Sequence, residues 1–177
     1  MALHFTIKEL CRSQYGIVYP KPYQLSLAYR LMKVLDIPRE HFGFPFNVLS
    51  GIRNAEIVRK MAQDNNCLNS SNLTDHSFMD PEVNLFGVGA IDFTCKQITK
   101  VKDIFYYILE KSLSRDFPTI GQLIWYPKRY FIHIANPKSL VFSTEAKELF
   151  NIHIPTKYLI YNEKKKIFER AETSARR

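Results

Sequence analysis

The sequence contains little cysteine and no long apolar run. Its three cysteines, Cys11, Cys67 and Cys95, cannot all pair with one another and form no C-x-x-C motif, which argues against a disulfide scaffold and a thiolate zinc site. No apolar run approaches the roughly 18 residues that a membrane-spanning helix needs. The first residues also lack the basic and apolar segments of a secretory signal. We therefore expect a protein made in the cytoplasm, with no membrane span and with reduced cysteines.

Positive charge is in excess, and half of it lies near the end of the chain. The net charge is +8, a value typical of proteins that meet a polyanion such as nucleic acid, anionic lipid or a cell wall. Residues 157–177 contain seven basic and three acidic residues, so the rest of the chain is only slightly basic. A nucleic-acid module needs basic residues interleaved with exposed aromatics. Because the basic run is collected at one end, we interpret it as a solvated end of the chain or, alternatively, as an electrostatic tether to a polyanion, and we expect no nucleic-acid partner.

The length of 177 residues and the 46% of apolar residues predict one folded domain. We place this domain at residues 1–156, followed by a last strand and a basic C-terminal tail at 157–177. Hydrophobic periodicity predicts helices at 25–35, 54–63, 100–112 and 144–150, and strands at 46–49, 87–93, 122–126, 130–135 and 157–161. Pro22 and Pro38 are expected to mark the two ends of the first helix. This pattern predicts an α+β fold, with a small, mostly antiparallel sheet and helices packed on one side.

Three polar residues stand out against their surroundings. His76 follows a polar loop, and His133 interrupts the apolar segment 131–135. Strand alternation places His133 on the face opposite its two neighbouring isoleucines, and it separates Asp92 from Ile91 and Phe93 in the same way. Two histidines and a carboxylate suffice for a catalytic zinc site. From alternation alone, hydrogen-bonded polar groups within a sheet remain the alternative.

Several short strings, taken in order, resemble the zinc peptidases of the D-alanyl-D-alanine carboxypeptidase and L-alanyl-D-glutamate endopeptidase type, which phages and bacteria encode. The strings are FTIKELCRS at 5–13, SGIR at 50–53, T-x-H at 74–76, G-x-x-A-x-D at 87–92, QLIW at 122–125 and FIHI at 131–134. The resemblance implies a hedgehog/DD-peptidase-like fold in which His76, Asp92 and His133 hold Zn²⁺. It also implies that Arg53 and Thr74 bind substrate; the alternative for Arg53 is an ordinary salt bridge in a loop.

Two features depart from that family. His76 and Asp92 are sixteen residues apart, farther than the family places them, and residues 79–86 look like an insertion. Tyr130 stands three residues before His133, where the family carries the carboxylate that acts as general base. Tyrosine, with a pKa near 10, is a poor base at neutral pH but can hydrogen-bond an oxyanion. Besides Tyr130, the candidate replacements for the missing base are Asp80 and Glu82 on the inserted loop.

The sequence thus predicts a zinc metallopeptidase, a hydrolase that cuts peptide bonds in the stem peptides of peptidoglycan. Without an export signal, an enzyme that acts on the wall needs another route across the membrane, so we expect an endolysin or a virion component of a phage, released to the cell wall at lysis or used in wall penetration. The alternative is a catalytically weak zinc-containing module that binds cell wall or serves structurally beside other virion proteins, because Tyr130 replaces the carboxylate. A nucleic-acid-binding protein is the third hypothesis; it predicts binding that weakens steeply with salt.

Overall fold

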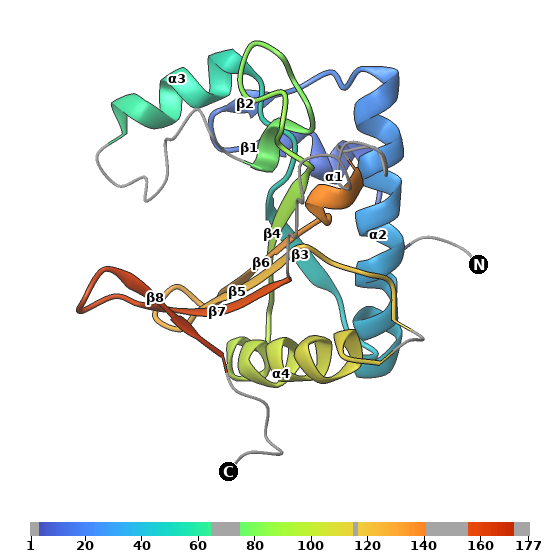
Figure 1. Cartoon of the computed structure of the whole chain (residues 1–177), viewed down its shortest axis with the longest axis vertical. Coiled ribbons are helices and arrows are strands. Elements are labelled where there is room, and N and C mark those ends of the chain that lie inside the picture. Colours follow the sequence, from blue (N-terminus) through green and yellow to red (C-terminus); the bar gives the residue numbers. More distant parts are fainter. Residues whose placement is uncertain (1–3, 65–74, 115–116, 141–155, 172–177) are drawn as a thin grey trace, which may run out of the picture.

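The computed structural model describes residues 4–64, 75–114, 117–140 and 156–171 (Figure 1). It shows an α+β fold, as predicted, built on a six-stranded sheet of order β3-β4-β6-β5-β7-β8. The strands are β3 Phe46–Ser50, β4 Ala90–Cys95, β5 Gln122–Tyr126, β6 Phe131–Ala135, β7 Lys157–Asn162 and β8 Ile167–Arg170. The sheet is mixed, because β7 runs parallel to β5 while the other neighbouring strands pair antiparallel.

The described residues form four α-helices besides this sheet. They are α1 Ile7–Leu10, α2 Pro22–Phe42, α3 Ala55–Gln63 and α4 Val101–Ser112. The short elements are the antiparallel strands β1 Arg12–Ser13 and β2 Gly16–Ile17 and the 3-10 turns η1 Asp75–Ser77, η2 Ile98–Lys100 and η3 Lys138–Leu140. Helix α1 begins with a capping box in which Thr6 and Glu9 exchange hydrogen bonds. Helix α3 begins after Asn54, whose side chain accepts a hydrogen bond from the Ile57 amide.

The first long helix extends beyond both expected ends. Pro22 lies inside its first turn, where the missing N–H would have no helical partner in any case. Pro38 lies within the helix and does not end it, so the prediction that Pro38 marks the end was wrong. The helix ends at Gly43, which adopts a left-handed φ of 70° and donates its N–H to the Arg39 carbonyl. Burial of the helix along most of its length outweighs the hydrogen bond that Pro38 removes.

The main core lies on one face of the sheet. The side chains of Ile91 and Phe93 from β4, Ile132 and Ile134 from β6 and Leu123 from β5 are all buried there. Helices α2 and α4 supply the other side of this core, and α4 contacts β5 and β6. Because side chains alternate along a strand, Asp92 and His133 lie on the opposite face of the sheet. The core therefore holds rigid the strands that carry these two polar residues.

The last strand of the sheet was missed by the sequence analysis. The strand expected at 157–161 is confirmed as β7, and β8 pairs with it in an antiparallel hairpin. The lysine run 164–166 therefore occupies the turn of this hairpin within the main sheet. The helix expected at 144–150 and the end of the tail at 172–177 lie outside the described residues. Within the described part, no helix is long and apolar enough to cross a membrane.

Candidate metal centre

Asp92 and His133 face each other across two central strands. They are directly paired in the register of β4 and β6, so their side chains leave the sheet side by side. Nδ1 of His133 lies 2.7 Å from Oδ1 of Asp92, and the two side chains are only 12% and 13% exposed. Strand alternation predicted that each of the two residues faces away from the core, and the register of β4 and β6 brings them together.

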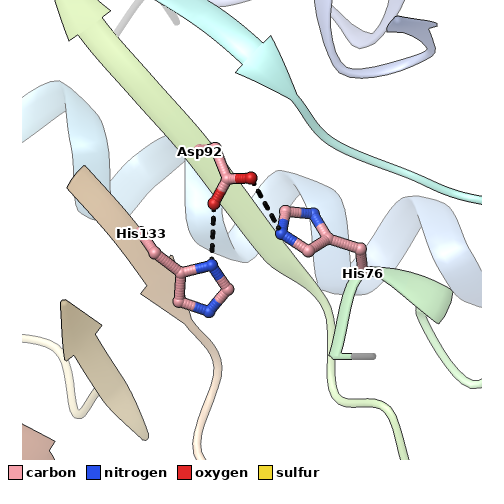
Figure 2. Close-up of side chains that lie close together, drawn as sticks. All are labelled: His76, Asp92 and His133. Carbon is pink, nitrogen blue, oxygen red and sulfur yellow. Dashed lines mark hydrogen bonds and ion pairs between the residues drawn. The ribbon is translucent and has the colours of Figure 1, made fainter. Parts of the chain in front are cut away.

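His76 approaches the same carboxylate from outside the sheet, from the 3-10 turn η1 (Figure 2). Its Nε2 lies 3.2 Å from Oδ2 of Asp92, and its side chain is 3% exposed. Nδ1 of His76 lies 2.8 Å from the carbonyl oxygen of Gly51. A carbonyl can only accept, so Nδ1 carries the proton and the lone pair of Nε2 is directed into the site.

The segment around Gly51 holds His76 on two sides. Besides the bond from the ring to Gly51, the Arg53 amide donates to the His76 carbonyl at 2.8 Å. Gly51 itself packs against the backbone of Leu10, where an added Cβ would lie 2.3 Å from the carbonyl oxygen. Only glycine permits this approach. The support that Gly51 gives to His76 depends on packing against Leu10, which no local sequence pattern reveals.

Arg53 lies beside the triad. Its Nη2 is 3.2 Å from Oδ2 of Asp92, its Nε donates to Oγ of Ser50 at 3.0 Å, and its side chain is 7% exposed. The predicted substrate-binding residue and the predicted metal ligand are therefore brought together. The contact also agrees with the alternative interpretation of Arg53 as a salt-bridge residue, because Arg53 forms a buried salt bridge with Asp92.

The surroundings of the two side chains shift both the pKa of Asp92 and the pKa of His76 downward. Burial by itself would raise the pKa of Asp92, but the neighbouring His76 and His133 hold that pKa well below its usual range. Burial lowers the pKa of His76, and the positive charge of Arg53 lowers it further. A carboxylate and a neutral imidazole are the forms that bind a metal cation.

These three side chains fit a metal ion. Their ligand atoms all lie within 4.8 Å of one another, and they form a group of two imidazoles and one carboxylate. Metal–ligand bonds of about 2.0–2.1 Å in a tetrahedron place ligand atoms about 3.3 Å apart, close to the 3.2 Å between His76 and Asp92. Within the described residues, Nε2 of the His133 ring is buried without a hydrogen-bond partner. The triad could therefore bind a metal ion.

The candidate general bases do not join this group of ligand atoms. Asp80 is buried in the loop of residues 79–86, where its Oδ1 accepts a hydrogen bond from the Glu82 amide. The exposed Glu82 lines a surface hollow against helix α3. Tyr130 lies in the turn between β5 and β6 with a left-handed φ of 52°, and its side chain is 47% exposed. Thr74 lies outside the described residues.

Tyr126 is the aromatic residue of β5 on the same sheet face as the triad. Its ring is buried, and burial together with the charge of Asp92 raises the pKa of its hydroxyl, which stays protonated at neutral pH.

Comparison of the chain with protein-family models, with curated proteins and with solved structures finds no match.

Proposed function

We propose that the protein is a zinc metallopeptidase with a hedgehog/DD-peptidase-like fold, acting on the stem peptides of peptidoglycan in phage lysis or wall penetration. The observation that carries the proposal is the buried convergence of His76, Asp92 and His133. Two imidazoles and a carboxylate form the donor set of catalytic zinc sites, which leave one position open. The ordered strings that resemble the zinc peptidases point to the same three residues.

The residues around the triad suit this chemistry. A bound zinc ion would supply a Lewis acid that polarises a peptide carbonyl and activates a water. The Gly51 carbonyl fixes the tautomer and ring orientation of His76, the usual role of a second hydrogen bond to a ligating histidine. Arg53 presents a planar guanidinium beside Asp92, a group whose geometry suits the carboxylate of a substrate. In this proposal Arg53 orients the substrate and buffers the charge of Asp92.

The second candidate function is a zinc-containing module that binds cell wall or serves structurally in a virion, with little or no catalysis. The position of the expected general base favours it. At the position where the family has its general base, this chain has Tyr130, which lies in a turn with a half-exposed side chain. The carboxylate of Asp80 accepts a hydrogen bond within its own loop. A positioned general base contributes typically 10²–10⁴-fold to the rate, so its loss would leave a slow enzyme.

One experiment separates the two functions. The protein is loaded with one zinc per chain and incubated with purified peptidoglycan, and the release of free amino groups is followed. The peptidase proposal expects release that is abolished in His133→Ala and retained in His41→Ala. His41 is a suitable control because it stacks on Tyr107 at a centroid distance of 4.1 Å, outside the triad. Stoichiometric zinc without any release would refute the peptidase and support the binding module.

A further inference from the structure

Four aromatic rings form a continuous cluster across the strands β5 to β8. We call this cluster, made of Tyr126, Phe131, Tyr161 and Phe168, the aromatic platform. Tyr126 stacks on Phe131 at 4.2 Å between centroids, and the rings of Tyr161 and Phe168 lie 5.0 Å apart. Tyr126 joins the two pairs, at 5.3 Å from Tyr161 and 6.2 Å from Phe168. In each of the two pairs, the residues are also directly opposite each other on neighbouring strands, so the sheet holds the platform in place.

The platform lies on the same face of the sheet as the metal centre. Phe131 and His133 are two residues apart on β6 and therefore point to the same side. The intervening Ile132 belongs to the core on the opposite side, and none of the four platform residues does. Two residues of a strand span about 6.6 Å. The platform thus begins next to the triad and leads away from it along the hairpins β5–β6 and β7–β8 (Figure 1).

Part of the platform is open to solvent. Phe168 is 49% exposed, Phe131 and Tyr161 are partly exposed, and the Tyr126 ring is buried beneath its neighbours. Aromatic side chains gathered at the surface of a soluble protein indicate a contact site more often than isolated apolar residues do. Because the rings already pack on one another, a ligand would lose little free energy in ordering them.

The turns that border the platform are basic. The β5–β6 turn contains Lys128 and Arg129, and the β7–β8 turn contains Lys164, Lys165 and Lys166. Two of these basic residues form ion pairs: Arg129 lies 3.7 Å from Glu163, and Lys165 lies 3.2 Å from Glu169. In the part of the chain that the structure describes, no ion pair involves Lys128, Lys164 or Lys166. The platform is therefore a set of aromatic rings bordered by positive charge.

We propose that the aromatic platform binds the sugar chain of an anionic glycan whose peptide branch reaches the metal centre. This inference rests on the proposed function. Sugar rings present C–H groups that pack against the electron-rich faces of aromatic rings. The basic turns complement the carboxylates that peptide stems carry along such a chain. Continuity of the platform with the triad on one sheet face favours a branched glycan over a nucleic acid, which offers no peptide to the metal centre.

The test measures binding of the full-length protein to purified peptidoglycan sacculi by co-sedimentation, with a chelator present to prevent turnover. Phe168→Ala is expected to weaken binding about tenfold, as the loss of one stacking contact would. Tyr19→Ala is the matched control, because Tyr19 is an exposed aromatic (88%) outside the platform. Phe168→Trp keeps an aromatic ring and should bind the sacculi as the wild type does. Binding by Phe168→Trp as weak as that by Phe168→Ala would count against the platform.

The charged turns are tested by a second pair of variants. Lys164→Gln with Lys166→Gln should weaken binding and make it less sensitive to salt. The control, Lys96→Gln with Lys102→Gln, removes the same charge from exposed positions near α4 and should bind like the wild type. Equal effects in the two pairs would mean that net charge alone attracts the wall. That result would overturn the proposal, as would a Phe168→Ala variant that binds like Tyr19→Ala.

Two further measurements separate the possible partners and separate this inference from the proposed function. An oligodeoxythymidylate that binds more tightly than the sacculi, with the same loss in Phe168→Ala, would assign the platform to single-stranded nucleic acid and refute the glycan. Hydrolysis of a free stem peptide by zinc-loaded protein tests the peptidase alone. Platform-dependent binding without hydrolysis would sustain the inference while the peptidase proposal fails. Hydrolysis with no effect of Phe168→Ala on sacculus binding would do the reverse.

Discussion

Replacing Gly51 with alanine should damage both the fold and the metal centre. A Cβ at this position would lie 2.3 Å from the carbonyl oxygen and 2.8 Å from the Cα of Leu10, so backbone rather than a flexible side chain obstructs it. Overpacking of this kind costs typically 1–3 kcal/mol, and a backbone obstacle places the expected loss of unfolding free energy at about 2–3 kcal/mol. The shift also moves the carbonyl that binds Nδ1 of His76. Loss of such a supporting bond lowers metal affinity by about 10–100-fold.

Urea unfolding of the metal-free protein and zinc titration against a competing chelator measure the two effects separately. Gly43→Ala is the matched control: it has open space around the added Cβ but a left-handed φ of 70°. It should lose about 1–2 kcal/mol of stability through backbone strain and keep the zinc affinity of the wild type. Equal zinc affinity in Gly51→Ala and Gly43→Ala, despite a loss of stability in both, would refute the role assigned to the Gly51 carbonyl.

Three further predictions concern metal, acid and thiols. Free zinc at about 100 times its Kd should raise Tm by about 5–11 °C, and a chelator should reverse the gain. No shift of Tm in calorimetry would refute zinc binding at the triad. Burial and Arg53 keep the pKa of His76 below its ordinary value of 6.5, so the unfolded state takes up more protons below that pH. The metal-free protein should therefore lose stability as the pH falls below about 6.5, by at most about 1.4 kcal/mol per pH unit from this group, and pH-independent urea midpoints from pH 7 to 5 would contradict this. In a Cys67→Ser background, Cys11 and Cys95 should react slowly with a thiol dye until denaturant is added, because both are buried and burial raises the pKa of each thiol; fast labelling of the native protein would show otherwise.

Local periodicity was sufficient for the parts of the fold that a single segment determines. The apolar period of 100–112 predicted α4 almost to the residue, and alternation placed Asp92 and His133 on the polar face of their strands. Alternation could not pair the two strands. Their direct opposition comes from a register set by long-range packing of the core, which no window of the sequence contains.

The prediction was weakest where local chemistry and tertiary context disagree. The lysine run 164–166 reads as a solvated tail, yet it forms the turn of a hairpin because β7 adds to the main sheet beside β5. We expected basic and aromatic residues to be separate because the lysine run was read as a tail, but the hairpin places this run in the turn between the strands that carry Tyr161 and Phe168. Pro38 shows the same limit, since burial of α2 overrides the local signal for a helix end.

The pairing of β4 with β6 has a consequence for how the protein can be checked. A slip of one residue between these strands would exchange His133 for an isoleucine on the polar face and bury the imidazole in the core. Asp92 would then lose its partner across the sheet. A metal ion held by both side chains would bind only to correctly registered strands, so zinc uptake, on the proposed function, would measure the fraction of molecules whose sheet has the right register.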